Sequence, residues 1–496
     1  MKLIQRAEAK GFRYELIQGS ADREVTALCY DSRELREGCL FVCMRGANFD
    51  SHSLLPSLAA AGVQIAVTDH DCALPEGLTV LRVEDSREAL SQLSAAWFDF
   101  PAEKLTTIAV TGTKGKTSTT HMIREILERA GRKTGLIGTN GITIGDCHRE
   151  TKNTTPESYH LHEAFAEMVE AGCSCAVMEV SSQGLMLHRT GGICFDYGIF
   201  MNISPDHIGP NEHASFEEYL HWKAALFRQC RVGLLNADDA HTEEIIGNAS
   251  CEKIWRFSTE HRPADFSVAG LRYAAEEGFV GLCFDFLSPE REALPVRVGI
   301  PGRFNADNAL AALAVCSLIG AGREALSTGL QSVRINGRME IANAAPFTVI
   351  VDYAHNAVSM EALLDTLREY GPRRLVVVFG CGGNRAKERR YSMGEIGGRK
   401  ADLSIITADN SRFERVEDII ADIRGSIEKT GGAYLEIPDR REAIFYAVEH
   451  AEPGDMIAVI GKGHEDYQEI EGVRHHFVDR EVVDEALKRR FGEKKS

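Results

Sequence analysis

The sequence predicts an α/β protein of three domains, with mostly parallel sheets in its central and C-terminal parts. Its 496 residues are enough for about three domains with separate cores. Short apolar runs alternate with helical segments along much of the chain, which is typical of parallel sheets. Near the middle, an apolar run enters a glycine-rich turn and then an amphipathic helix. We place the domains at residues 1–103, 104–336 and 337–496.

Residues 1–103 have the pattern of a small α/β domain. A loop with Asp31-Ser32-Arg33 precedes a short buried strand at 38–43, and a polar turn follows at 45–50. A helix from about Ser53 to Ala61 and an apolar strand at 63–67 come next. The residues alone favour a turn with a surface cation for Ser32 and Arg33.

A phosphate-binding loop is predicted at the start of the second domain. The apolar run 105–110 precedes it, and an amphipathic helix that ends near Gly131 follows. Backbone N–H groups of such a loop bind phosphate oxygens, its lysine reaches the β- and γ-phosphates, and its hydroxyl binds Mg²⁺. Val110 stands where the usual pattern has its first glycine, and the alternative is an ordinary turn before a capped helix. The expected nucleotide-binding residues are Gly112, Thr113, Lys114, Gly115, Lys116, Thr117 and Ser118.

Two further strands of the second domain end in polar residues. The run 176–180 ends in Glu179 and Val180, and the run 199–203 leads to Ser204-Pro205-Asp206-His207. Open α/β sheets place catalytic and metal-binding groups at such strand ends. Glu179 and His207 are therefore candidates to hold Mg²⁺ beside Thr117, and a hydrogen-bonded residue at a strand end is the equal alternative for each. A β-rich insertion at 261–299 and an alanine-rich helix from about 306 to 319 complete this domain.

The third domain is predicted to be a doubly wound parallel sheet. Strands at 349–352, 375–379, 404–407 and 456–460 alternate with helical segments. Polar loops at 352–356, 380–385, 409–412 and 461–465 follow these strands, so they should line one crevice. Because this domain has no phosphate loop, we expect it to hold a second substrate.

Composition excludes several classes of function. A net charge of −17 argues against a broad nucleic-acid or anionic-membrane surface. Thirteen cysteines without a C-x-x-C pair are typical of reduced, mostly buried thiols in the cytoplasm. The start of the chain is polar, and no apolar run has membrane-spanning length. We therefore expect a cytoplasmic protein that binds no nucleic acid and does not insert into membranes.

Eight motifs, in this order, resemble the Mur ligase family over nearly the whole chain. One such motif would be weak evidence, but eight in order are specific. They are Asp31-Ser32-Arg33, Gly112 to Thr117, Thr154-Thr155-Pro156, Glu179-Val180-Ser181-Ser182, Gly302-Arg303-Phe304-Asn305, Gly337-Arg338-Met339-Glu340, Asp352-Tyr353-Ala354-His355 and Gly461 to Glu465.

The resemblance implies an ATP-dependent, amide-forming ligase of peptidoglycan precursor synthesis. The branch that it resembles most adds the third amino acid to UDP-N-acetylmuramoyl-L-alanyl-D-glutamate. It implies an N-terminal UDP-binding domain, a central P-loop ATPase and a C-terminal, Rossmann-like domain for the amino acid. It further implies ATP and Mg²⁺, small-molecule substrates and a monomer.

The resemblance also implies roles for single residues. Those expected to hold the UDP-muramoyl-dipeptide are Ser32, Asn48, Asn153, Thr154, Thr155, Ser181 and Arg189. Those expected to contact ATP outside the loop are Asn305, Arg338 and Asp352. Lys223 matches a lysine that the family carries as a carbamate bound to Mg²⁺, although a bare lysine there would otherwise be taken for an exposed helical residue.

The implied chemistry fits these residues. The γ-phosphate of ATP activates the D-glutamate side-chain carboxylate as an acyl phosphate, which the amine of the third amino acid then attacks. Lys116, Mg²⁺ and Arg338 would neutralise the transferring phosphoryl group, with domain closure excluding water. Glu179, His207 and Lys223 complete the expected catalytic set, of which Thr117, Glu179, His207 and Lys223 are the metal ligands.

The third amino acid is argued from the Asp409-Asn410-Ser411-Arg412 loop. Relatives that select meso-diaminopimelate have Asp-Asn-Pro-Arg here, and a guanidinium pairs with the carboxylate that lysine lacks. The residues expected to bind the amino acid are Arg385, Asp409, Asn410, Ser411, Arg412, Gly461 and Glu465. We expect meso-diaminopimelate, with L-lysine or ornithine as alternatives. Arg412 could instead cap the following helix or pair with Glu414.

The sequence departs from the family pattern in four places, and two other functions compete. Lys114 stands where asparagine is common, Asn356-Ala357 replaces Thr-Pro, Ser411 replaces proline, and Leu187 replaces a polar residue. A folylpolyglutamate or cyanophycin-type synthetase is one alternative, which the Asp-Ser-Arg motif of the first domain opposes. A nucleotide-controlled scaffold of cell-wall enzymes is the other, which complete motifs in all three domains oppose.

Overall fold

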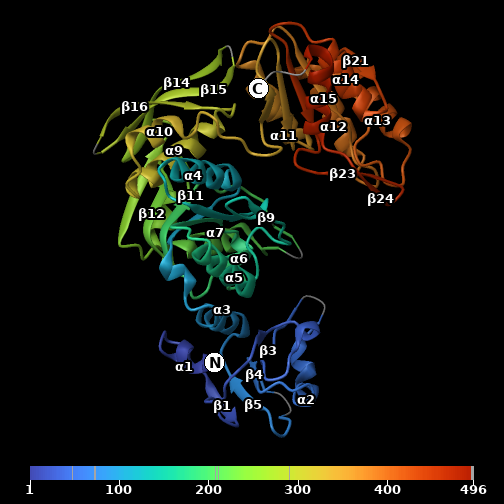
Figure 1. Cartoon of the computed structure of the whole chain (residues 1–496). Helices are drawn as coiled ribbons and strands as arrows, with labels where there is room; N and C mark the ends of the chain where they lie inside the picture. Colours follow the sequence, from blue (N-terminus) through green and yellow to red (C-terminus); the bar gives the residue numbers. More distant parts are fainter. Residues whose placement is uncertain are drawn as a thin grey trace. The chain divides into compact units, whose positions relative to one another are not determined.

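The computed structural model of the chain describes residues 1–46, 49–71, 74–206, 208–209, 212–276, 278–289 and 291–492 (Figure 1). The chain forms two compact units. The first contains residues 1–266 and 311–322, and the second contains residues 267–310 and 323–496. Each unit is described by itself.

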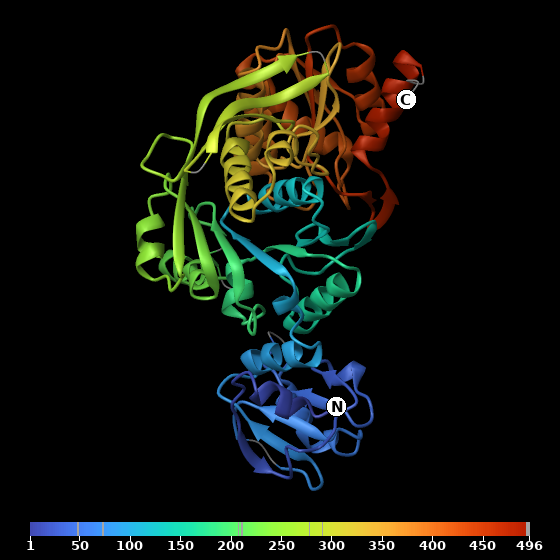
Figure 2. The ribbon, with the colours of Figure 1, turned by 60° about the vertical axis from the view of Figure 1, so that its left-hand side comes forward.

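The first unit begins with a five-stranded sheet in the order β1-β5-β4-β3-β2. All neighbouring pairs are parallel except β1 with β5. Helix α3 packs against this sheet, and the Asp85 side chain caps its N-terminus (Figure 2). The elements are α1 (Leu3–Glu8), β1 (Glu15–Gln18), β2 (Leu28–Cys29), β3 (Leu40–Val42), α2 (Leu55–Leu58), β4 (Ile65–Thr68), β5 (Thr79–Arg82) and α3 (Ser86–Trp97).

The predicted helix from Ser53 to Ala61 is wrong in its bounds. A 3-10 turn, η2 (Ser51–Leu54), precedes a single α-helical turn, α2. The Asp50 carboxylate accepts a hydrogen bond from the His52 backbone N–H, so the turn begins earlier than the apolar pattern suggests.

The second sheet of the first unit carries the predicted phosphate loop. From β13 to β7 its order is β13-β12-β11-β6-β10-β7, all parallel, and β8 and β9 add an antiparallel edge. Its strands are β6 (Thr106–Thr111), β7 (Thr134–Gly138), β8 (Gly141–Ile144), β9 (Cys147–Arg149), β10 (Cys175–Glu179), β11 (Phe195–Phe200), β12 (Cys230–Asn236) and β13 (Lys253–Ser258). Because β10 and β11 flank β6, all three carboxyl ends meet at one edge.

Five helices follow or cover these strands. The predicted amphipathic helix is α4, and Gly131 follows its end in a left-handed conformation. The helices are α4 (Lys116–Arg129), α5 (Ser158–Glu170), α6 (Ser182–Met186), α7 (Phe216–Ala225) and α8 (Thr242–Gly247). One buried cluster joins α5 and α7 to the sheet, including Phe165, Phe195, Phe200 and Tyr219.

The second unit contains the predicted β-rich insertion and the predicted parallel sheet. The insertion is an antiparallel set, β14 (Phe266–Glu276), β15 (Phe279–Ser288) and β16 (Arg291–Val298). Helix α9 (Phe304–Leu318) matches the predicted alanine-rich helix, and α10 (Arg323–Thr328) follows it.

The C-terminal sheet has the order β17-β18-β22-β19-β20-β21, and all pairs except β17 with β18 are parallel. Helices α14 and α15 pack against it through a buried cluster, and helices lie on both sides of its strands in Figure 1. The strands are β17 (Glu340–Asn343), β18 (Thr348–Asp352), β19 (Leu375–Phe379), β20 (Leu403–Ile406), β21 (Tyr434–Glu436) and β22 (Met456–Ile460), with β23 (Tyr467–Ile470) and β24 (Val473–His476) as a hairpin. The helices are α11 (Ala357–Arg368), α12 (Glu388–Lys400), α13 (Val416–Thr430), α14 (Arg440–Glu449) and α15 (Asp479–Phe491).

The predicted α/β class with mostly parallel sheets is confirmed. Among the described residues, no helix combines the length and apolarity needed to span a bilayer.

Candidate functional site

The glycine-rich loop between β6 and α4 has the geometry of a phosphate-binding loop. Gly115 caps α4 in a left-handed conformation with φ of 87°, which a side chain would strain. A Cβ at Gly112 would come within 2.9 Å of the Met201 Cβ, so a glycine is needed there too. Val110, where the usual pattern has glycine, is buried inside β6, and the loop begins after it. The free N–H groups at the start of α4 point toward this loop.

Asn202, which follows β11, holds this loop through hydrogen bonds. The Thr113 N–H donates to the Asn202 carbonyl at 2.9 Å, and the Lys114 N–H donates to Asn202 Oδ1 at 2.9 Å. The Thr113 hydroxyl lies 3.0 Å from the Tyr219 hydroxyl of α7. The loop is therefore held in place before any ligand binds.

Lys116 is folded back onto the loop. Its Nζ donates to the Gly112 carbonyl at 2.8 Å and to the Thr113 carbonyl at 3.3 Å. Burial lowers the pKa of the Lys116 ammonium, while the charges of Glu179 and Asp206 act to raise it. A phosphate would satisfy this cation better than two carbonyls do.

Glu179 lies beside the loop, as the end of β10 predicts. The Thr117 hydroxyl donates to Glu179 Oε1 at 3.0 Å, and Thr139 donates to both carboxylate oxygens from its N–H and hydroxyl at 2.9 and 3.2 Å. Glu179 is only 1% exposed, so this carboxyl group is buried, and its hydrogen bonds hold it beside the loop.

Gly138 makes room for the Glu179 carboxylate. It ends β7, the strand next to β10, and a Cβ built on it would collide with Glu179 Oε1. The position of the carboxylate therefore depends on a residue that has no side chain.

The residues predicted to hold the muramoyl-dipeptide continue from Glu179. The Thr155 hydroxyl donates to the Glu179 carbonyl at 3.1 Å and accepts from the Ser181 N–H at 3.0 Å. The Arg189 guanidinium donates to the Thr155 carbonyl at 3.1 Å. Thr154 lies 3.0 Å from the Thr139 hydroxyl. Asn153 and Ser32 are exposed, and no polar contact of their side chains was found.

Lys223 is buried, contrary to the exposed position that the bare helical pattern suggests. It is 1% exposed, and its Nζ lies 4.6 Å from the centre of the Tyr219 ring. Burial lowers the pKa of Lys223 well below its usual range, with the nearby Lys116 charge acting in the same direction. Such an amine is readily neutral, which is the form that reacts with carbon dioxide.

The oxygen donors of the site fit Mg²⁺. The Thr117 hydroxyl and the Glu179 carboxylate already lie within 3.0 Å of each other, and both are the hard ligands that this ion prefers. An ammonium cannot bind a cation, so Lys223 could join the set only as a carbamate. The fourth predicted ligand, His207, and the predicted UDP contact Asn48 lie outside the described residues.

In the second unit, Asp352 organises the backbone around Arg338. The Asp352 carboxylate accepts hydrogen bonds from the Met339 N–H at 2.8 Å and the Ala354 N–H at 2.7 Å, while burial raises its pKa. The Arg338 guanidinium lies over the Tyr353 ring at 4.9 Å. Arg338 and Asp352 are thus neighbours. The Asn305 side chain is buried and donates to the Pro301 carbonyl at 2.6 Å.

Three loops at the carboxyl ends of β19, β20 and β22 come together as predicted. Asn410 donates to Glu465 Oε2 at 2.9 Å, and the buried Lys462 donates to Asn410 Oδ1 at 3.2 Å and to Glu465 Oε2 at 3.1 Å. A Cβ at Gly461 would lie 2.7 Å from Asp409 Oδ2. Contacts therefore join the loops that hold Asp409, Asn410, Ser411, Arg412, Gly461 and Glu465, and Arg385 is exposed in the 380–385 loop.

Arg412 does not pair with Glu414. Its Nη1 donates to the Gly383 carbonyl at 2.7 Å, and its Nε lies 3.3 Å from Glu469. Glu414 instead binds Arg390 at 2.8 Å. With φ of 51°, Arg412 is in the left-handed region.

Sequence reasoning missed several polar residues of these sites. Thr139 directly follows β7, and polar residues at the carboxyl ends of parallel strands are candidates for such sites, so the sequence could have indicated it. Lys462 lies inside the Gly461 to Glu465 motif, whose pattern does not indicate the contacts of this lysine with Asn410 and Glu465. His213 contacts the Ser182 hydroxyl at 2.8 Å across 31 residues, and no local pattern indicates that contact.

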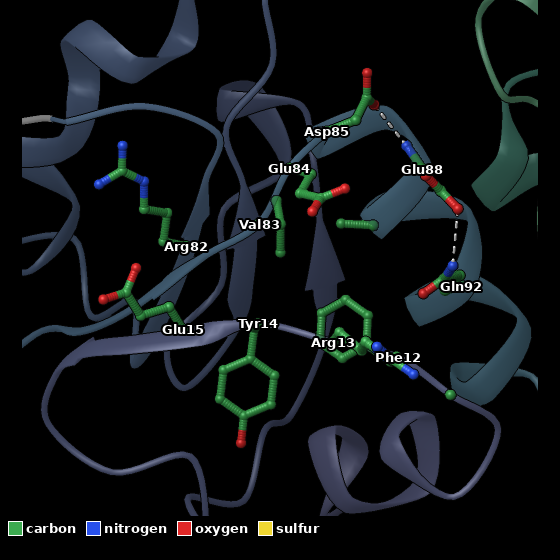
Figure 3. Close-up of a pocket in the computed structure, with 12 residues that line it drawn as sticks. Phe12, Arg13, Tyr14, Glu15, Arg82, Val83, Glu84, Asp85, Glu88 and Gln92 are labelled. Carbon is green, nitrogen blue, oxygen red and sulfur yellow. Dashed lines mark hydrogen bonds between the residues drawn. The ribbon is translucent and has the colours of Figure 1, made fainter.

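A separate pocket of about 510 Å³ lies in the N-terminal sheet region (Figure 3). Glu15 of β1, Arg82 of β5 and Arg13, which precedes β1, line it together with Glu88 and Gln92 of α3 and Asp85, which caps that helix. None of the residues predicted for a site lines this pocket.

Comparison with known proteins matches the chain along its length. Residues 24–98 match the Mur ligase family catalytic domain, 110–316 the Mur ligase middle domain, and 337–463 the Mur ligase, glutamate ligase domain. UDP-N-acetylmuramoyl-L-alanyl-D-glutamate–2,6-diaminopimelate ligase 1 of Clostridium acetobutylicum is 38% identical over 97% of this chain and 98% of its own length. The ligase of the same name from Bacillus velezensis is 38% identical over 94% and 95%.

A solved structure of a UDP-N-acetylmuramoyl-L-alanyl-D-glutamate–2,6-diaminopimelate ligase is also similar. It has a TM-score of 0.77 and 30% identity, and the match covers 95% of this chain and 97% of that one.

Proposed function

The chain belongs to the Mur ligase family, and on that premise we propose that it joins 2,6-diaminopimelate to UDP-N-acetylmuramoyl-L-alanyl-D-glutamate at the expense of ATP. Full-length similarity to ligases that carry this activity in their names supports the proposal. The reaction makes the tripeptide precursor of peptidoglycan.

One observation carries the proposal furthest. A continuous path of hydrogen bonds joins the phosphate loop to the residues proposed for the muramoyl-dipeptide, from Thr117 through Glu179 to Thr155. Phosphoryl transfer needs the γ-phosphate and the acceptor carboxylate in contact. A loop and an acceptor site that share one buried glutamate meet that need.

The mechanism follows from the charges of the site. Lys116 would leave its carbonyl partners to bind the β- and γ-phosphates and to stabilise the charge that builds up in transfer to the substrate carboxylate. The resulting acyl phosphate is attacked by the amino-acid amine, and phosphate leaves. Mg²⁺, when bound by Thr117, Glu179, His207 and carbamylated Lys223, would supply further positive charge to the phosphates.

The other assignments belong to the same proposal. We propose three domains at residues 1–103, 104–336 and 337–496, with Ser32, Asn48, Asn153, Thr154, Thr155, Ser181 and Arg189 binding the UDP-substrate. Asn305, Arg338 and Asp352 keep their proposed role in binding ATP. Since both nucleotide substrates are cytoplasmic metabolites, the reaction is placed in the cytoplasm, and we propose a monomer.

The choice of amino acid is assigned to Arg412. Its guanidinium is oriented by the Gly383 carbonyl and Glu469, with Asn410 and Glu465 in the same set of loops. A carboxylate at the far end of diaminopimelate can pair with a guanidinium, whereas the lysine ε-ammonium would be repelled.

The experiment compares meso-diaminopimelate with L-lysine as substrates, in wild type and in Arg412→Ala. Wild type should prefer diaminopimelate, and Arg412→Ala should lose about 10²-fold or more in kcat/KM for it, because one buried charge contact is removed. Arg415→Ala, an exposed arginine three residues away, is the matched control. A wild-type preference for lysine, or an unchanged preference in Arg412→Ala, refutes the assignment.

A further inference from the structure

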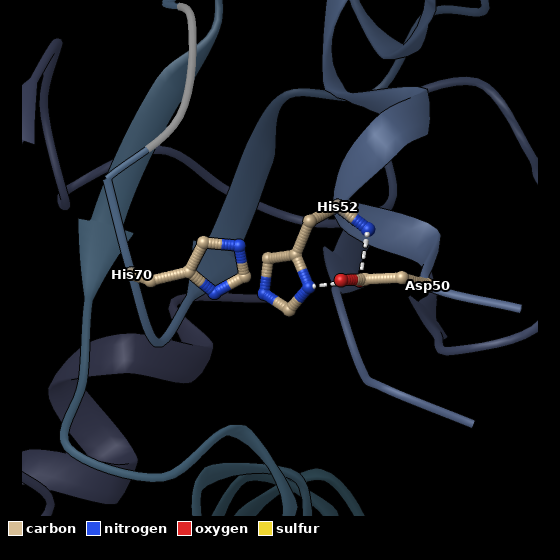
Figure 4. Close-up of side chains that lie close together, drawn as sticks. All are labelled: Asp50, His52 and His70. Atoms are coloured by element: carbon tan, nitrogen blue, oxygen red, sulfur yellow. Dashed lines mark hydrogen bonds and ion pairs between the residues drawn. The ribbon is translucent and has the colours of Figure 1, made fainter. Parts of the chain in front are cut away.

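Two histidines and two aspartates lie together after neighbouring strands of the N-terminal sheet, and none of them has a proposed role in the ligase reaction. Asp50 and His52 follow β3, and Asp69 and His70 follow β4. Because β3 and β4 are neighbouring parallel strands, their carboxyl ends bring these side chains together (Figure 4). Ligand atoms of Asp50, His52 and His70 all lie within 4.8 Å of one another.

The contacts within this cluster are short and directional. His52 Nδ1 lies 2.6 Å from Asp50 Oδ1, and His70 Nδ1 lies 2.6 Å from Asp69 Oδ1. The two imidazole rings are 4.0 Å apart between centres, and Figure 4 shows His52 between Asp50 and His70. The two carboxylates thus flank a pair of imidazoles whose planes are tilted by 44° to each other.

The hydrogen bonds within the cluster leave one buried nitrogen, His52 Nε2, without a hydrogen-bond partner. His52 is 4% exposed, and its Nε2 is buried without a hydrogen-bond partner, although Asp69 Oδ1 lies 3.3 Å away. A buried imidazole nitrogen with no partner is costly. In Figure 4 this nitrogen is on the side of the ring that faces His70.

We propose that this cluster binds one divalent transition-metal ion of the zinc class, with His52 Nε2, His70 and Asp69 as ligands. Imidazole and carboxylate are ligands that Zn²⁺ accepts, whereas Mg²⁺ prefers oxygen donors alone. Asp50 then has the role of the outer carboxylate that orients a metal-binding histidine through its other nitrogen.

The surroundings allow the cluster to close on an ion. Ligand atoms about 2.0–2.1 Å from a tetrahedral zinc ion lie about 3.3 Å from one another. His52 Nε2 and Asp69 Oδ1 already have this spacing, at 3.3 Å, whereas His70 Nδ1, 2.6 Å from Asp69 Oδ1, must move away from it. The side chain of His70 is 32% exposed and stands at the end of a strand, so it can move and an ion can enter. Two acidic groups beside the imidazoles balance the charge of the ion.

Metal binding would add bonds between two loops that already meet through His52 and Asp69. The ion would tie the start of η2 to the end of β4, and Asp50 also pairs with Arg45 at 3.3 Å. The segment between Arg45 and Asp50 contains the residue proposed to contact UDP. The site therefore lies where a bound ion would stabilise the substrate loop.

The test uses the untagged, full-length protein, stripped of metal and then titrated with Zn²⁺ against a chromophoric chelator in excess Mg²⁺. Wild type should bind one equivalent more than His70→Ala, while His475→Ala, an exposed histidine in β24, should match wild type. Asp50→Asn should keep the site but lose about 10–100-fold in affinity.

Co²⁺ absorption identifies the ligands. The equivalent lost in His70→Ala should show tetrahedral d–d bands without thiolate-to-metal charge transfer, because no cysteine is among the proposed ligands. Equal stoichiometry in wild type and His70→Ala, no binding at all, or a thiolate band on that equivalent would each overturn the proposal. Circular dichroism of His70→Ala checks that the variant is folded.

Discussion

Lys116 and Lys223 are both buried near the phosphate loop, but their surroundings suit them to different roles. Lys116 has two carbonyl oxygens as hydrogen-bond partners and two carboxylates nearby, so it can remain a cation. Lys223 has an aromatic ring beside its Nζ and another cation near it. The first is suited to bind phosphate, and the second is suited to lose its proton and be modified.

Replacing Lys116 with alanine should nearly abolish ligation. The transferring phosphoryl group would lose its main cationic partner, which typically costs about 10²–10³-fold in kcat. Steady-state kinetics of phosphate release measure this. Lys104→Ala is the matched control, because Lys104 is an exposed lysine before β6 that has no proposed role. Full ligation by a folded Lys116→Ala protein would remove this loop from the mechanism.

Replacing Lys223 with alanine should also inactivate the enzyme, but a short carboxylate should restore part of the activity. Acetate or formate can occupy the space that the carbamate leaves and offer the same oxygen ligands. Activity is measured with and without added carboxylate, and Lys116→Ala, which no carboxylate should rescue, is the comparison. Normal activity of Lys223→Ala without any addition would contradict carbamylation.

At the scale of elements, the strands were more predictable than the helices. Buried parallel strands are continuous apolar runs, so the bounds of β18, β19, β20 and β22 agree with the prediction to within one residue. The short α2 differs, because a single carboxylate, Asp50, moves the start of its turn. Functional groups of open α/β sheets lie at the carboxyl ends of the strands, and on this basis the sequence alone also indicated Glu179 and the Asp409–Arg412 loop.

The remaining parts of the site depend on contacts between distant residues. The burial of Lys223 results from packing on Tyr219 and the sheet, which helical periodicity alone does not encode. Likewise, Thr139 meets Glu179 across 40 residues, and Asn202 meets Lys114 across 88. Such pairs follow from strand order, which a single sequence specifies only indirectly.

Helix α5 provides a test of pH dependence. Burial lowers the pKa of His162 to about 4, whereas an unfolded histidine titrates near 6.5. Between these values the unfolded chain binds a proton that the folded chain does not, so stability falls as the pH decreases from about 6.5 toward 4. For this residue the loss at pH 5 is about 2 kcal/mol.

His162→Gln should therefore reduce the fall in melting temperature between pH 7.5 and pH 5 by a few degrees. Glutamine can still donate to the Gly191 carbonyl, which His162 Nε2 contacts at 3.2 Å. The control is His160→Gln, which changes a more exposed histidine of the same helix. If both variants keep the wild-type pH dependence, His162 does not contribute to acid destabilisation.

At the scale of the whole molecule, the proposed reaction needs residues from both units. The phosphate loop belongs to the first unit, and the loop with Arg412 belongs to the second. An amide bond can form only after the carboxylate is activated and while the amine is bound. Hydrolysis of the acyl phosphate before the amine attacks would waste the ATP that formed it.

Phosphate release should accordingly require both UDP-muramoyl-dipeptide and the diamino acid. With either one omitted, the rate should fall to a small fraction of the coupled rate, and product should equal released phosphate when both are present. Coupled phosphate detection and chromatography of the UDP-product measure the two quantities. Rapid phosphate release without an amino acid would favour a nucleotide-controlled scaffold over a ligase.

The lack of a side chain at Gly138 limits which substitutions the protein can tolerate at this position. No substrate needs to touch this residue, yet even a methyl group there would displace the Glu179 carboxylate. A saturation mutagenesis screen in growing cells should record Gly138 as intolerant to every substitution, with the same severity as Glu179 itself. Suppressors should arise at neighbouring strands that shift the backbone away, and they should be rare, because β7 and β10 are paired along four residues.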